Sequence, residues 1–265
     1  MSLNTAAATL RVGKSVLLQP TSLTLKGGEI TAICGPNGAG KTSLLRLLSA
    51  DVRPSSGGVS LNGRELSQWR AQDRAQTLAV LPQHSSLNFA FAVEDVVALG
   101  RSPHASGRQR DQQIVSAALA AVDSGHLRGR CYTDLSGGEQ QRVHLARVLA
   151  QIWQPSAHGE RYLLLDEPTA SLDLAHQALL LDVVKGFAAE GVGVCLVVHD
   201  LNLAARCADR LLLMRAGEVV ASGPPAEVLT VAAVKAVFDV DVQLLAHPQS
   251  GAPLVIQNES DKKLR

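Results

Sequence analysis

Residues 30–42 read ITAICGPNGAGKT and contain the most informative pattern in the sequence. It opens with a mainly apolar run, residues 30–34, whose length fits a buried strand. The rest fits the pattern G-x-x-x-x-G-K-[ST], and segment 41–50 after it has leucines at helical spacing. Glycines let the backbone wrap an anion, and the helix N-terminus adds partial positive charge. An ordinary glycine turn is the alternative, but the strand–turn–helix setting favours a phosphate-binding loop.

This loop predicts a site for ATP and Mg²⁺. Lys41 is expected to reach the β- and γ-phosphates, and Thr42 to place its hydroxyl on Mg²⁺. The predicted nucleotide-binding residues are Gly35, Pro36, Asn37, Gly38, Ala39, Gly40, Lys41, Thr42 and Ser43.

A second apolar run ends in two carboxylates, Asp166 and Glu167. Ligands of open parallel sheets bind beyond the carboxyl ends of the strands, so this pair is expected to face the phosphates. Asp166 can hold Mg²⁺ through its water shell, and Glu167 can orient and polarise the attacking water. The alternative is a solvated acidic loop in which Asp166 caps the next helix.

The segment Ser136-Gly137-Gly138-Glu139 predicts a helix start. Ser136 and Glu139 have the spacing of a capping box. The cap does not explain the glycine pair, because glycine destabilises a helix by up to about 1 kcal/mol per residue. Bare N–H groups at a helix start bind anions, so we interpret these four residues as a second phosphate-binding element.

Strands alternate with helices along much of the chain, which predicts an α/β fold with a mainly parallel sheet. The expected strands are residues 30–34, 162–165 and 192–198, and the expected helices are residues 41–50, 137–151 and 174–190.

Two further regions break this alternation. Alternating residues 23–25, the turn at 26–28 and a similar pattern at 59–63 predict an N-terminal antiparallel β layer beside the parallel sheet. Residues 84–154 have helical spacing with a polar interruption at 100–107, which predicts a helical subdomain inserted into the core. We expect one nucleotide-binding domain over residues 1–265, with a P-loop NTPase core.

Composition narrows the function. The net charge is +1, with 25 basic and 24 acidic residues. The chain thus lacks the excess of basic residues that would indicate a nucleic-acid partner.

No apolar run is long enough to span a bilayer and no secretory signal is visible, so a cytoplasmic chain is expected. The four cysteines, Cys34, Cys131, Cys195 and Cys207, are scattered and are expected to be reduced. The polar end, residues 257–265, is expected to fray.

Six motifs in this order resemble the ATP-binding cassette family. They are GPNGAGKT (35–42), Gln83 in LPQ (81–83), LSGGEQQR (135–142), YLLLDEP (162–168), SLD (171–173) and His199. The resemblance implies that Glu167 and His199 are catalytic, that Gln83 contacts Mg²⁺ and the attacking water beside Asp166, and that Asp173 belongs to a dimer-contact loop. It also implies a head-to-tail homodimer with ATP between the loop of one copy and Ser136 and Gly138 of the other.

One position departs from the family pattern. The family stacks adenine on an aromatic residue upstream of the phosphate loop, and the matching position here is Val12, beside Arg11. Weak base stacking predicts poor discrimination between ATP and GTP.

Shorter and less specific sequence similarities indicate which kind of transporter the cassette serves. FAVEDVVALGR (91–101) and HDLNLAA (199–205) resemble importers of iron chelates, cobalamin and haem. Within that group, QHS (83–85), ARVLAQIW (146–153) and HPQSG (247–251) resemble the ATPases of haem importers. This similarity implies two membrane-spanning permease subunits, an indirect periplasmic binding protein and a peripheral place on the cytoplasmic face of the bacterial inner membrane. A siderophore or cobalamin importer, an iron–sulfur assembly cassette and a two-gene exporter remain alternatives.

The segment from His84 to about Arg110 is expected to carry the docking surface for the membrane subunit, because it follows Gln83. Its arginines Arg101, Arg108 and Arg110 are candidates for contacts with the partner or the membrane surface, and a solvated loop is the alternative.

Overall fold

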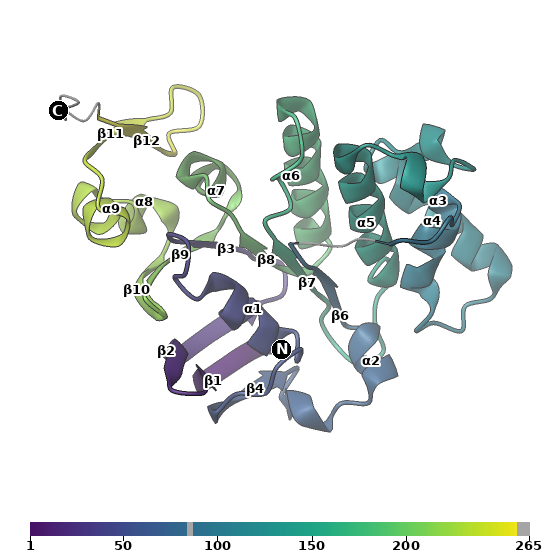
Figure 1. The fold of residues 1–265 in the computed structure, drawn as a ribbon, viewed down its shortest axis with the longest axis horizontal. Helices are drawn as coiled ribbons and strands as arrows, with labels where there is room; N and C mark the ends of the chain where they lie inside the picture. Colours follow the sequence, from purple (N-terminus) through teal and green to yellow (C-terminus); the bar gives the residue numbers. More distant parts are fainter. Residues whose placement is uncertain (84–86, 259–265) are drawn as a thin grey trace.

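The structure is a computed structural model that describes residues 1–83 and 87–258. Its central sheet has the strand order β10-β9-β3-β8-β7-β6 (Figure 1). Neighbours from β9 to β6 are parallel, and β10 pairs antiparallel with β9. The strands are β3 (Ile30–Cys34), β6 (Leu78–Leu81), β7 (Tyr162–Asp166), β8 (Gly193–Val197), β9 (Arg210–Arg215) and β10 (Glu218–Gly223). The predicted mainly parallel sheet is confirmed.

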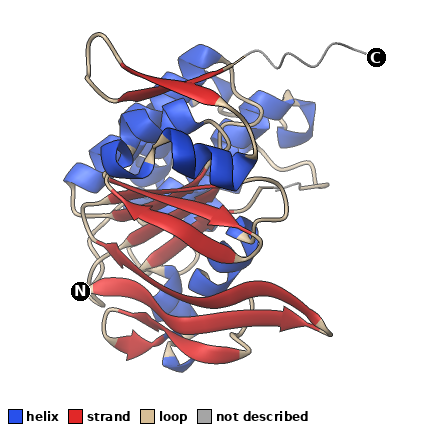
Figure 2. Cartoon of the chain, turned by 90° about the vertical axis from the view of Figure 1, so that its left-hand side faces the viewer, coloured by secondary structure: helices blue, strands red, loops and turns tan. Residues whose placement is uncertain are grey.

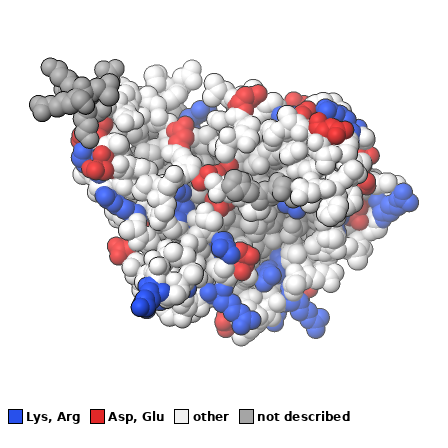
Figure 3. All heavy atoms as spheres, viewed as in Figure 1, with Lys and Arg blue, Asp and Glu red and all other residues white. Residues whose placement is uncertain are grey.

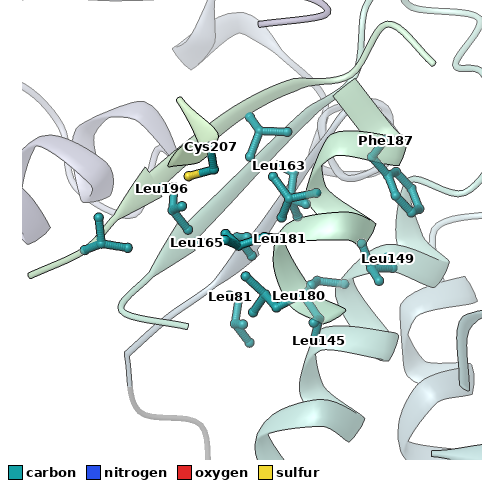
Figure 4. Packing of buried hydrophobic residues seen from close by; sticks show 14 of the residues in the cluster. Leu81, Leu145, Leu149, Leu163, Leu165, Leu180, Leu181, Phe187, Leu196 and Cys207 are labelled. Carbon is teal, nitrogen blue, oxygen red and sulfur yellow. The ribbon is translucent and has the colours of Figure 1, made fainter. Parts of the chain in front are cut away.

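Both faces of this sheet are covered, which explains why its strands read as continuous apolar runs. Every residue of β3, β7 and β8 is buried. Side chains alternate between two cores: Ile33 and Leu164 pack with the N-terminal sheet and α1 (Lys41–Leu48), whereas Leu163 and Leu165 face the helices on the other side. Figure 4 shows this second core, in which leucines of the strands meet Leu145 and Leu180.

The N-terminal strands form the separate antiparallel layer that the sequence predicted. The strand order is β2-β1-β4-β5, and the layer is seen below the central sheet in Figure 2. Leu3 of β1 lies opposite Leu25 of β2 and Leu61 of β4. The bounds are β1 (Ser2–Val12), β2 (Ser15–Lys26), β4 (Ser56–Leu61) and β5 (Arg64–Glu65), followed by η1 (Leu66–Gln68) and α2 (Ala71–Ala75).

Helices fill the chain between β6 and β7, as expected for an inserted helical subdomain. They are α3 (Val93–Ala98), η2 (Leu99–Arg101), α4 (Arg108–Ala121), η3 (Gly125–Leu127), η4 (Tyr132–Asp134) and α5 (Gly137–Gln151). Helix α5 has the predicted bounds, and α4 starts where the polar interruption was expected to end. The first residues of the predicted segment, 84–86, lie outside the described part of the chain.

The structure corrects the role expected of Arg101. Its side chain is 3% exposed, and its guanidinium donates to Asp111 Oδ1 at 2.9 Å and to the carbonyl of Ala150 at 2.6 Å. The prediction that Arg101 meets a partner or the membrane is therefore wrong. A buried guanidinium needs such partners, and here it neutralises Asp111 and closes the C-terminal end of α5.

After β7 the chain forms α6 (Leu174–Ala189), then α7 (Leu201–Cys207) between β8 and β9. The last elements are α8 (Pro225–Val228), α9 (Val231–Phe238), β11 (Val242–Ala246) and β12 (Pro253–Gln257). The β11–β12 hairpin was not predicted, and Gln257 belongs to it instead of a frayed end; residues 259–265 lie outside the description. Among the helices of the described residues, none has the length and apolar character needed to cross a bilayer.

Candidate active site

The phosphate loop runs from the end of β3 to the start of α1, and its glycines are required by close contacts. A Cβ on Gly35 would overlap the carbonyl oxygen of Met214. Gly40 has φ +95°, and a Cβ there would lie 2.8 Å from the carbonyl oxygen of Leu17. Glycines at these positions let the loop fold back closely against β9 and β2.

Lys41 is the first residue of α1 and its side chain lies under the loop. Its Nζ donates to the carbonyl oxygens of Gly35 at 2.8 Å and Pro36 at 3.1 Å. Burial lowers its pKa, and the nearby Glu167 and Asp166 oppose that shift. The ammonium is thus held inside the loop, on the side from which phosphate oxygens can be reached.

Asp166 ends β7 and is 2% exposed. Burial raises its pKa, while a hydrogen bond from Thr42 and the charge of Lys41 oppose the rise. One carboxylate oxygen, Oδ1, is buried without a hydrogen-bond partner among the described residues. An orphaned carboxylate oxygen beside a threonine hydroxyl is a donor set that suits Mg²⁺. The alternative in which Asp166 caps the next helix is wrong, because Asp173 caps α6.

Glu167 adopts the left-handed backbone conformation, with φ 50°. This conformation is strained for a residue with a Cβ, and strain of this kind is concentrated at functional sites. The residue is fixed by its N–H, which donates to the carbonyl of Val197 at 3.0 Å. The turn directs the carboxylate away from the line of β7 and over the loop.

Two side chains from other segments contact the Glu167 carboxylate. Gln83, two residues after the end of β6, donates its Nε2–H to Oε2 at 2.7 Å. His199, after β8, places Nε2 2.5 Å from Oε1. Three neighbouring strands β6, β7 and β8 therefore deliver one residue each to a single cluster at their carboxyl ends.

A cavity of about 410 Å³ lies over the loop. Its lining comprises Leu17, Asn37, Gly38, Ala39, Gly40, Lys41, Thr42, Ser43, Gln83 and Glu167. Most of the sequence-predicted nucleotide residues therefore meet at one cavity. Val12 is not part of it: the residue is 62% exposed at the end of β1, and Leu17 on β2 supplies the apolar edge instead.

Sequence reasoning missed two residues near this cavity. Leu17 has no motif around it and could be found only from the packing of β2 against the loop. Arg147 of α5 lines an adjoining cavity together with Thr42, Gln83 and Asp166. Its Nε is buried and has no hydrogen-bond partner among the residues that the structure describes. Helical spacing alone gives no sign that an arginine on α5 faces the acidic strand end.

The signature residues form a second cluster, separate from the cavity. The capping box is present: Glu139 N–H donates to Ser136 Oγ at 3.4 Å, and Ser136 N–H donates to Glu139 Oε2 at 2.8 Å. The Ser136 hydroxyl and backbone N–H both donate to Glu139 and lower its pKa. A Cβ on Gly137 would meet open space, whereas one on Gly138 would lie 3.0 Å from the carbonyl of Ser171.

Asp173 lies on the same side of the chain as the signature cluster. Its carboxylate accepts from the N–H of His176 at 2.9 Å and contacts the imidazole Nδ1 at 2.8 Å. These hydrogen bonds from His176 lower the pKa of Asp173. The loop 171–173 is therefore fixed at the start of α6, next to Gly138.

The fold and the site together define a nucleotide-binding ATPase of the P-loop class with an inserted helical segment. The profile of the family described as ABC transporter matches residues 18–170. The hemin import ATP-binding protein HmuV of Pseudomonas entomophila is 56% identical over 93% of this chain and 96% of its own length, and that of Myxococcus xanthus is 50% identical over 97% of both. This chain belongs to the ABC transporter family.

Solved structures agree on the fold. A chain of a metal-chelate type ABC transporter in an inward-facing conformation has a TM-score of 0.79 and 28% identity, covering 97% of both chains. The dimeric cassette MJ0796 has a TM-score of 0.75 and 24% identity, covering 84% of this chain and 98% of its own. The central sheet, the N-terminal antiparallel sheet and the helical insertion are thus the cassette fold.

Proposed function

We propose that this chain hydrolyses ATP to power the import of haem through a membrane transporter, as its energy-coupling subunit. The observation that carries the proposal is the cluster of Gln83, Glu167 and His199 over the phosphate loop, in a chain that matches hemin import proteins over nearly its whole length.

The geometry supports the following roles for the site residues. Lys41 and the loop N–H groups bind the phosphates. Glu167 accepts hydrogen bonds from both sides, so its carboxylate is oriented to polarise an attacking water, and His199 is placed to contact the γ-phosphate. Thr42, Gln83 and Asp166 would hold Mg²⁺, which when bound neutralises charge on the phosphates.

The signature cluster supports a homodimer. Ser136, Gly137 and Gly138 lie outside the cavity of their own chain, and Gly137 has open space around it. Among the residues that the structure describes, no contact requires a glycine at 137, at a helix start that can bind an anion. A second copy placed head to tail would bring its cavity to this helix start, with the loop at Asp173 at the seam. ATP would then bind both copies and favour the closed state.

The cargo proposal rests on the relatives. Eight proteins with 45–56% identity over at least 92% of this chain carry the name hemin import ATP-binding protein. Such a subunit would act with two membrane-spanning permeases and, indirectly, a periplasmic binding protein, at the cytoplasmic face of the inner membrane. On the face in Figure 3, acidic and basic side chains are interspersed, so docking would rely on shape more than on one sign of charge.

The test is transport in proteoliposomes that contain the permeases, with this chain and ATP on the side that represents the cytoplasm. Haem loaded on its binding protein should cross the bilayer and stimulate ATP hydrolysis. A ferric siderophore and cobalamin on their own binding proteins serve as competing cargoes. Transport of either of these without transport of haem would contradict the cargo, and absent ATP hydrolysis would contradict the ATPase role.

A further inference from the structure

His199 occupies a short connection whose two ends are fixed differently. On the strand side, the N–H of Val198 donates to the carbonyl of Ile33 at 3.1 Å, in continuation of the sheet. On the helix side, Asp200 caps α7 by accepting from the N–H groups of Asn202 at 2.8 Å and Leu203 at 3.2 Å. The position of His199 therefore depends on where the first turn of α7 lies.

Helix α7 has seven residues, too few to be stable without tertiary contacts. One face packs into the core through Leu203 and Ala204. The opposite side meets β12 of the C-terminal hairpin, which lies against α7 in Figures 1 and 2.

The polar link between α7 and the hairpin is the amide of Asn202. Its Nδ2 donates to the carbonyl of Val255 at 3.1 Å, and its Oδ1 accepts from the N–H of Val255 at 2.7 Å. Both backbone groups of one β12 residue are thus satisfied by one side chain, as a neighbouring strand would satisfy them. Such a two-point contact fixes both the distance and the orientation of α7.

The hairpin is built to hold Val255 in place. Strand pairing sets Leu244 opposite Val255, and Val255 packs against the main core. In the turn, Nδ1 of His247 accepts from the N–H groups of Gln249 and Ser250, at 3.3 Å each. The HPQSG segment, which the ATP site does not use, therefore closes this hairpin.

We propose that the C-terminal hairpin braces α7 through Asn202, and that Asn202 is a positioning residue that keeps His199 against Glu167. This inference rests on the proposed ATPase function. The loop residues that bind nucleotide are attached to β3 and α1, so loss of the brace should impair the hydrolytic step and leave ATP binding intact.

The test compares Asn202→Ala with wild type in the full-length chain, by kcat and KM for ATP hydrolysis. We expect kcat to fall roughly tenfold, less than the roughly 10²-fold that a 1 Å misplacement can cost, with KM unchanged within about twofold. Asn202→Asp keeps the oxygen that accepts from Val255 and should retain an intermediate kcat. Gln243→Ala, an exposed position on β11, is the matched control and should keep the wild-type kcat.

A double variant separates positioning from general damage. If Asn202 acts through His199, the variant His199→Ala with Asn202→Ala should hydrolyse ATP no more slowly than His199→Ala alone. A further drop, or a wild-type kcat in Asn202→Ala, overturns the inference. If Asn202→Ala does not fold, Asn202→Asp decides: a wild-type kcat in that variant overturns the brace. Failure of wild type to hydrolyse ATP would instead contradict the proposed function.

Discussion

The imidazole Nε2 of His199 lies 2.5 Å from Oε1 of Glu167, although the two residues come from different strand ends. Strands β7 and β8 are parallel neighbours, with Asp166 opposite Val197, so the residues after them must meet. The left-handed conformation of Glu167 turns its carboxylate toward His199 and Gln83. Sheet order and one strained residue thus assemble the cluster that we propose to be catalytic.

Replacing Glu167 with Gln should remove the base but keep the shape of the site. We expect ATP binding near the wild-type level. The kcat should fall by a factor of about 10²–10⁴, because a positioned general base accelerates a reaction by about that factor. The variant should also accumulate as an ATP-bound dimer. Size-exclusion chromatography with and without ATP, together with phosphate release, measures both effects. Glu218→Gln, an exposed carboxylate on β10, is the control, and unchanged hydrolysis in Glu167→Gln would contradict the assignment of the base.

Replacing Lys41 with Ala should affect an earlier step. The ammonium is held by two loop carbonyls, where it can reach a phosphate oxygen. A charged hydrogen bond to that oxygen would contribute about 1.5–3 kcal/mol to ATP binding. We therefore expect the Kd for ATP to rise by roughly tenfold or more, measured by calorimetry or fluorescent nucleotide displacement. Lys185→Ala removes an exposed lysine of α6 and should bind ATP like wild type. Equal affinities in the Lys41 and Lys185 variants would argue against the phosphate contact.

The nucleobase should be weakly discriminated. Leu17 is the apolar edge of the cavity, and no aromatic side chain lines it in the part of the chain that the structure describes. We expect KM values for ATP and GTP within a few-fold of each other. Leu17→Trp should lower the KM for ATP about fivefold or more, because stacking on one base contributes about 1–3 kcal/mol. A strong ATP preference in wild type would refute this prediction.

The sequence was sufficient wherever local chemistry decides the structure. The phosphate-loop motif, the capping box at Ser136 and the apolar runs of β3, β7 and β8 can each be recognised from residues close in the chain. Their assembly into one cluster followed from the rule that ligands bind at the ends of parallel strands. The contacts that require Gly35 and Gly40, with Met214 and Leu17, become visible only in the fold.

What the sequence could not supply depends on contacts between distant segments. Arg101 reads as a surface arginine, and only the fold brings Asp111 and the end of α5 around it. Leu17 becomes part of the site because β2 passes beside the loop. The contact between α7 and the C-terminal hairpin depends on Asn202, whose partner Val255 is far along the chain.

Arg101→Ala should destabilise the helical insertion. The guanidinium also donates to Ser106 Oγ at 2.9 Å and Gln154 Oε1 at 3.1 Å. Its removal leaves the buried carbonyl of Ala150 and the partly buried Asp111 and Gln154 without this donor. Breaking a buried ion pair in this way costs about 3–5 kcal/mol. Urea unfolding should show that loss in the free energy of unfolding, whereas Arg108→Ala, at an exposed position, should change it by less than about 0.5 kcal/mol. Similar stabilities of the two variants would contradict this account of Arg101.

His104 should make the free energy of unfolding depend on pH. Its Nε2 lies 2.7 Å from the carbonyl of Gln151, at the end of α5. Burial lowers the pKa of His104, and the positive charge of Arg101 lowers it further. The hydrogen bond to Gln151 and the negative charge of Asp111 act in the opposite direction. The folded state therefore binds fewer protons than the unfolded chain, in which the histidine pKa is about 6.5. Stability should fall as the pH drops below about 6.5 and should level off once the lowered folded-state pKa has been passed.

The measurement is urea unfolding at pH 7.5 and at pH 5.5 for wild type and His104→Gln. Glutamine keeps an N–H donor for the Gln151 carbonyl but does not titrate, so this variant should lose less stability than wild type between the two pH values. His126→Gln changes an exposed histidine of the same helical segment and should keep the wild-type difference. A His104→Gln variant that loses as much stability as wild type would show that another group causes the acid sensitivity. If only His104→Gln loses less stability than wild type, the acid sensitivity is assigned to the His104 imidazole at the end of α5. The carbonyl of Gln151 is paired in both wild type and His104→Gln, so its pairing cannot cause the difference.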